Sequence, residues 1–147
     1  MMTTMAEILL VDDNPADLDL TIDALAQSPW RTHVSTVSDG AECMAYLRRE
    51  GKYADATRPH LMLLDLNLPL KDGRSVLADM KSNPALRRIP VVIFSTSQAQ
   101  KDIECSYELG ANSYVSKPPT LSEWVSAVKL LNHFWIGCAC LPSEEEQ

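Results

Sequence analysis

Five polar residues stand where short apolar runs end in this sequence, and their types could do chemistry together. Asp12 and Asp13 follow the first run, Asp65 follows a central one, and Ser95 and Lys117 stand at the ends of the last two. Three carboxylates placed together repel one another, so such a site needs a cation, and their hard oxygen ligands suit Mg²⁺. The lysine adds a fixed positive charge, and the serine hydroxyl can donate to a phosphoryl oxygen. A nucleophilic Asp65 beside these groups predicts a site that forms an acyl phosphate.

The apolar runs themselves predict the strands of a parallel sheet. Residues 61–64 contain no polar side chain, a pattern typical of a strand that is covered on both faces. Apolar runs also occupy residues 7–11 and 89–94, residues 32–37 alternate in the manner of a strand, and residues 113–116 are expected to form a short fifth strand. A helix is expected after each of the five segments. Five strands alternating with helices indicate the α/β class, with a doubly wound five-stranded parallel sheet. The carboxyl ends of such strands share one edge, so the five polar residues should meet in one crevice.

Each of these residues has a simpler interpretation when it is considered alone. The pair Asp12 and Asp13 could merely favour the positive N-terminal end of the next helix. Asp65 could be a turn residue, Ser95 could start a loop, and Lys117 could be a solvated cation before a proline turn. Their joint occurrence at four strand ends is what favours a functional site over these alternatives.

Composition bounds the class of protein. The 147 residues suit one domain, and 46% hydrophobic with 22% charged residues is ordinary for a globular protein. A formal net charge of -7 argues against a general nucleic-acid binder, although part of that charge belongs to Glu144, Glu145 and Glu146 near the end of the chain. The first residues contain no secretory signal, and no apolar run is long enough to span a bilayer. A cytoplasmic location without membrane association is expected.

The four cysteines are expected to be reduced thiols. Cys43, Cys105, Cys138 and Cys140 occur without a secretory signal, and small apolar packing is the ordinary role of such residues. The less favoured alternative is a metal or redox site at Cys138 and Cys140, which only His133 could extend.

The residues at the strand ends resemble those of the receiver domains of two-component response regulators, and the similarity covers nearly the whole chain. Asp12 and Asp13 resemble the acidic pair of that family, Asp65 its phosphoacceptor, and Lys117 with the following proline its lysine–proline signature. Ser95 stands at the conserved hydroxyl position. The intervals of 30 residues from Asp65 to Ser95 and 22 from Ser95 to Lys117 also agree with the family pattern.

The resemblance implies a flavodoxin-like receiver fold and a role for each matched residue. Mg²⁺ would be held by the acidic pair, Asp65 and the backbone carbonyl of Asn67, and a sensor histidine kinase would supply the phosphoryl group. Ser95 and Tyr114 would form the conformational switch, and the Lys117–Pro118 peptide bond would be cis. The chain would then act as a phosphorelay regulator rather than an enzyme, apart from its own phosphorylation and dephosphorylation.

The C-terminal residues exceed a minimal receiver. We therefore divide the chain into a receiver domain, residues 1–132, and a C-terminal extension, residues 133–147, with an apolar segment before an acidic tail. The extension resembles that of single-domain regulators that partner bacterial and cyanobacterial phytochrome kinases. Its apolar residues are expected to make a homodimer contact, and the alternative is that they fold back over the last helix. These residues are Phe134, Trp135, Ile136 and Leu141.

Three other functions are weaker alternatives. A phosphatase of the haloacid-dehalogenase type needs a second aspartate two residues after the nucleophile, where this chain has Asn67, and an amide cannot protonate a leaving group. A nucleotide-binding domain needs a phosphate-cradling loop, which the five scattered glycines do not form. A scaffold that has lost phosphorylation would not be expected to retain the acidic pair, Asp65 and Lys117. Because few residues follow 132, output is expected through contact with a downstream protein or onward phosphotransfer.

Overall fold

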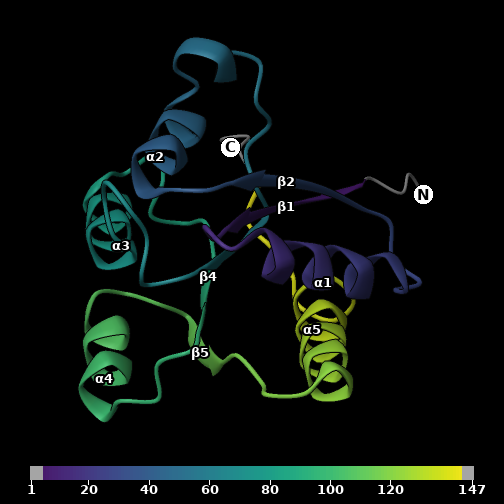
Figure 1. Ribbon diagram of the computed structural model, residues 1–147. Helices are drawn as coiled ribbons and strands as arrows, with labels where there is room; N and C mark the ends of the chain where they lie inside the picture. The colour runs from purple at the N-terminus through teal and green to yellow at the C-terminus, as the bar shows by residue number, and fades with distance from the viewer. Residues whose placement is uncertain (1–4, 144–147) are drawn as a thin grey trace.

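The computed structural model describes residues 5–143, and its centre is one parallel sheet of five strands (Figure 1). The strand order is β2-β1-β3-β4-β5. The strands are β1 (Ala6–Val11), β2 (Thr32–Val37), β3 (Leu61–Leu64), β4 (Val91–Ser95) and β5 (Ser113–Ser116). In β3 and β4 every residue is buried, as expected for strands covered on both faces. The predicted doubly wound α/β fold is confirmed.

Helices cover both faces of the sheet, and the strand residues divide between two cores. One core joins Leu9, Val11, Met62 and Leu64 to apolar residues of α2 and α3. The other joins the alternate strand residues to α1 and α5, which lie side by side in Figure 1. The helices are α1 (Pro15–Ala26), α2 (Gly40–Arg48), α3 (Gly73–Ser82), α4 (Gln100–Glu108) and α5 (Leu121–Trp135). A short 3-10 helix, η1 (Gly51–Tyr53), lies between α2 and β3.

Side-chain caps fix where four of the helices begin. Asn14 caps α1 through bonds from the backbone N–H groups of two residues in its first turn. Asp39, Asp72 and Thr120 cap α2, α3 and α5 in the same manner. Each cap accepts hydrogen bonds from backbone N–H groups that have no partner within the helix, and so stabilises the helix start at that residue.

The last helix continues past residue 132, where we divide the receiver domain from the extension. It continues to Trp135, and Trp135 and Ile136 pack against the core that α1 and α5 share. Gly137 is exposed, but it approaches Trp30 so closely that a Cβ atom placed on it would lie 2.3 Å from Cζ2 of that ring. The beginning of the extension therefore rests on the chain's own domain. The acidic residues 144–146 lie outside the described part of the chain.

Across residues 5–143, no helix combines the length and apolarity that crossing a bilayer requires. The four cysteines all lie within these residues and are free thiols. Among the described residues, the one cluster of side chains that could hold a metal consists of Asp12, Asp13 and Asp65. Cys138, Cys140 and His133 do not form a second cluster of this kind.

The close approach of α3 to β3 gives a stability prediction. A Cβ atom on Gly73 would lie 2.3 Å from the backbone oxygen of Asp65, so Gly73→Ala must displace the backbone that carries Asp65. We expect a loss of about 1–3 kcal/mol in the free energy of unfolding, measured by urea denaturation. Ser75→Ala, at an exposed position of the same helix, is the control and should change it by less than about 0.5 kcal/mol. Equal values for the two variants would contradict this account of the α3 contact.

Candidate functional site

Three carboxylates lie together at the carboxyl edge of the sheet. Asp12 and Asp13 follow β1, and Asp65 follows the neighbouring strand β3, whose last residue is in register with the last residue of β1. One ligand oxygen from each carboxylate lies within 4.8 Å of the others. Asp12 and Asp65 are buried, whereas Asp13 is exposed. This set of hard oxygen donors, open to solvent on one side, fits a divalent cation that retains some of its water.

Lys117 directly follows β5, and its ammonium group reaches this acidic cluster. Its Nζ donates to Oδ2 of Asp12 at 2.7 Å, to Oδ2 of Asp65 at 3.0 Å and to Oδ2 of Asp17 at 2.8 Å. The side chain is only 3% exposed. Since an ammonium group has three hydrogens, these bonds satisfy it completely.

Burial and pairing act in opposite directions on the charged groups. Burial alone would lower the pKa of Lys117, but its hydrogen bonds to the three aspartates outweigh burial and raise that pKa above its ordinary value. For Asp12 burial prevails, and it raises the pKa of the carboxyl despite the hydrogen bond from Lys117. The lysine is therefore charged at neutral pH, and it partly offsets the repulsion within the cluster.

Asp65 is held at both of its carboxylate oxygens. Oδ1 accepts the backbone N–H of Asn67 at 3.3 Å, and Oδ2 accepts the Lys117 ammonium. Asn67 itself is exposed. The carboxylate is thus oriented by two donors while its surroundings remain acidic, an arrangement that suits attack on an electrophile of high negative charge once a cation is present.

Ser95 is joined to the site through its backbone, because its carbonyl oxygen accepts the N–H of Lys117 at 2.7 Å. Ser95 closes β4 and is fully buried, and its Oγ has no hydrogen-bond partner among residues 5–143. A buried hydroxyl without a partner is uncommon and leaves a donor available. Tyr114 is half-buried on β5, and its hydroxyl donates to the backbone oxygen of Ser97 at 2.9 Å. The two residues are therefore connected through the segment that follows β4.

The structure adds polar residues that the sequence did not single out. Asp17 contacts Lys117, although an acid in the first turn of a helix ordinarily indicates only a favourable dipole. Asp102 accepts from Ser97 Oγ and from Arg74 Nη2, both at 2.6 Å, and these two bonds hold the pKa of Asp102 below its usual value. No spacing signals that group, because it depends on how α3 and α4 approach each other.

The prediction that the Lys117–Pro118 peptide bond is cis is wrong. The described residues contain no cis peptide bond, so this bond is trans. The trans form is the one that an X–Pro bond favours by about 0.5–1 kcal/mol in the absence of other constraints.

The four apolar residues of the extension are unequally exposed. Phe134 is 52% exposed, whereas Trp135 and Ile136 are partly buried against the chain's own core. Leu141 is also partly buried. Of the expected contact residues, Phe134 is therefore the one that presents a large apolar surface.

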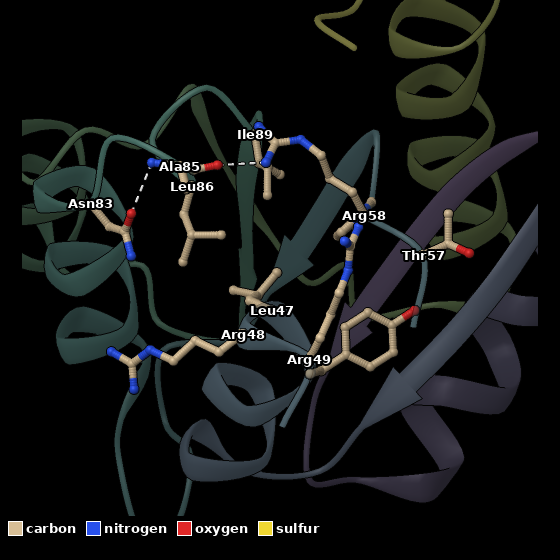
Figure 2. A pocket seen from close by; sticks show the side chains of 11 residues that line it. Leu47, Arg48, Arg49, Thr57, Arg58, Asn83, Ala85, Leu86 and Ile89 are labelled. Atoms are coloured by element: carbon tan, nitrogen blue, oxygen red, sulfur yellow. Dashed lines mark hydrogen bonds between the residues drawn. The ribbon is translucent and has the colours of Figure 1, made fainter. Parts of the chain in front are cut away.

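A pocket of about 290 Å³ lies at the other edge of the sheet (Figure 2). Pro59 and Ile89, which precede β3 and β4, contribute to its wall together with Arg48 and Leu86. Arg58 crosses it and donates from Nη1 to the backbone oxygen of Ala85 at 2.5 Å. The pocket lies at the amino ends of the strands, whereas the acidic cluster lies at their carboxyl ends.

Comparisons with known proteins find relatives along nearly the whole chain. Residues 8–129 match the response regulator receiver domain family. Response regulator Rcp1 of Synechocystis sp. is 43% identical over 136 residues, 92% of this chain and 92% of that protein. The phosphorylated cyanobacterial phytochrome response regulator RcpA superposes with a TM-score of 0.92 at 54% identity, covering 95% of this chain and 100% of that one. The Mn²⁺-bound form of Rcp1 gives a TM-score of 0.90 at 43% identity, covering 94% and 99%. The chain belongs to the response regulator receiver domain family.

Proposed function

We propose that this response regulator accepts a phosphoryl group on Asp65 from a histidine kinase. The observation that carries the proposal is the Lys117 ammonium 3.0 Å from Oδ2 of Asp65, beside two further carboxylates. A carboxylate oxygen of Asp65 attacks the phosphorus of a phosphohistidine, and the phosphorus–nitrogen bond breaks as the oxygen–phosphorus bond forms. Lys117 neutralises charge on the phosphoryl oxygens. The imidazole leaves with a proton from solvent.

Mg²⁺ is the cofactor that we assign to the acidic cluster. Asp12, Asp13 and Asp65 would hold it, together with the backbone carbonyl of Asn67, and the ion would neutralise charge on the transferring group. The Mn²⁺-bound form of the similar regulator Rcp1 supports this assignment, because Mn²⁺ and Mg²⁺ prefer the same oxygen ligands.

The phosphorylated state would be transmitted through Ser95 and Tyr114. The Ser95 hydroxyl is buried without a partner and can donate to a phosphoryl oxygen, which would draw the segment after β4 inward. Tyr114 is bonded to that segment at Ser97, so it would follow the movement. The surface altered is that of α4, β5 and α5, where a downstream protein would bind.

We propose that the phosphodonor is a kinase of the phytochrome type, because the similar protein RcpA is a cyanobacterial phytochrome response regulator. The proposed location of the reaction is the cytoplasm. No catalytic activity on an external substrate is part of the proposal. Asn67, in the position where a haloacid-dehalogenase phosphatase has its general acid, cannot supply a proton.

We also propose that the chain forms a homodimer through the exposed side of α5. Leu130 and Phe134 lie one helical turn apart and are 70% and 52% exposed. Paired apolar exposure of this kind on one helix face is typical of a contact surface.

Phosphorylation is tested with acetyl phosphate and Mg²⁺, followed by intact mass measurement. We expect one phosphoryl adduct on the wild type and none on Asp65→Asn, since the amide is not a nucleophile for this step. Asp55→Asn, an exposed loop position, is the matched control and should be modified like the wild type. An adduct on Asp65→Asn equal to that of the control would rule out Asp65 as the acceptor.

If Asp13 is a metal ligand, Asp13→Asn should stabilise the protein without Mg²⁺ and reduce the stabilisation that Mg²⁺ gives. Without the ion, the variant loses a charge repulsion of about 1 kcal/mol, so its thermal midpoint should rise by ~2–4 °C. With saturating Mg²⁺ the wild type should gain more stability than the variant, because the variant has lost a ligand. Calorimetry with EDTA and with MgCl₂ measures both effects. An equal gain from Mg²⁺ in both proteins would remove Asp13 from the ligand set.

The dimer is tested by analytical ultracentrifugation of Phe134→Glu. A charge on the contact face should shift the dimer toward the monomer, weakening association by ~10-fold or more. Leu121→Glu, also exposed on α5 but at its opposite end, is the control and should leave the mass unchanged. A monomeric wild type, or a dimer that tolerates Phe134→Glu, would overturn the contact.

A further inference from the structure

Lys117 is shared by three carboxylates, and one of them lies outside the acidic cluster. Asp17 belongs to the first turn of α1, and its Oδ2 is 2.8 Å from the Lys117 ammonium. Its side chain is only 20% exposed. The contact spans 100 residues of sequence and joins α1 to the end of β5.

The backbone around Asp17 is fixed independently of this contact. Its N–H donates to the Asn14 cap at 3.2 Å, and its carbonyl oxygen accepts from Thr21 Oγ1 at 3.0 Å. Thr21 Oγ1 in turn accepts from Trp124 Nε1 of α5 at 3.1 Å. Cap, helix and neighbouring helix therefore hold the Asp17 carboxylate where Lys117 can reach it.

The charge balance decides what this contact does. Four carboxylates face one ammonium group when Asp17 is added to Asp12, Asp13 and Asp65. A divalent ion would offset charge on the cluster, but Asp17 is not among the residues close enough to share that ion. Because the three hydrogens of Lys117 are all in use, a phosphoryl oxygen can gain one only if a carboxylate gives one up.

We propose that Asp17 is a positioning residue that holds Lys117 before phosphorylation and then competes with the phosphoryl group for its ammonium. The inference rests on the proposed phosphorylation of Asp65. Asp17 thereby weakens the phosphorylated state, while its negative charge strengthens divalent cation binding nearby. Removing that charge should therefore raise the affinity for a phosphoryl group and lower the affinity for Mg²⁺.

The test is titration of Asp17→Asn with beryllofluoride, a phosphoryl analogue, at saturating Mg²⁺, and separately with Mg²⁺ alone. Beryllofluoride should bind roughly 3- to 10-fold tighter than to the wild type, and Mg²⁺ roughly 2- to 3-fold weaker. Tryptophan fluorescence is a suitable signal, because the Trp124 ring centre lies 6.0 Å from Lys117 Nζ. Asp17→Ala, which also removes the hydrogen-bond acceptor, should shift both affinities in the same directions.

Asp19→Asn is the matched control, because it removes the same charge from an exposed position of the same helix. It should leave beryllofluoride affinity unchanged. If Asp17→Asn behaves like this control, or if it weakens both ligands, Asp17 does not compete for Lys117 and the inference fails. If wild type binds Mg²⁺ but no beryllofluoride, the proposed phosphorylation fails, and this inference fails with it. Circular dichroism of every variant identifies any loss of folding, and Asp17→Ala supplies the second measurement if Asp17→Asn is affected.

Discussion

The buried ammonium group of Lys117 is the constraint on which the site depends. It satisfies oxygens from Asp12, Asp17 and Asp65, which come from the end of β1, the start of α1 and the end of β3. Without a positive charge at this point, buried carboxylates would repel one another and would be desolvated without compensation. The Lys117 side chain therefore allows the carboxylates to lie close together, as ligands for a cation and, in Asp65, as the acceptor of a phosphoryl group.

The same interaction connects the site with the outer parts of the fold. Through Asp17, Lys117 is coupled to α1, and α1 is bonded to Trp124 of α5 through Thr21. On the other side, the segment after β4 is tied to Asp102 by Ser97 and to β5 by Tyr114. The backbone bond from Lys117 N–H to the carbonyl oxygen of Ser95 joins that segment to the site, so hydrogen bonds link Lys117 both to α1 and to the segment after β4.

The sequence predicted the fold and the composition of the cluster because both follow from local patterns. Strands without polar residues require cover on both faces, and parallel strands place Asp12, Asp65 and Lys117 at one edge. Asp17 could not be identified, since a first-turn acid is explained equally well by the helix dipole. The bonds of Asp102 and the packing of Gly137 on Trp30 depend on tertiary approach, which no spacing encodes. Phe134 and Trp135, which the sequence places in a separate extension, belong to α5, because Trp135 packs against the core that α1 and α5 share.

A crystal structure with Mg²⁺ and beryllofluoride would test the central role of Lys117 most directly. We expect fluoride bonded through beryllium to Asp65, with the Lys117 ammonium within hydrogen-bond distance of a fluorine and no longer in contact with Asp17. A complex in which Lys117 keeps its three carboxylate partners and leaves the fluorines without its charge would contradict it.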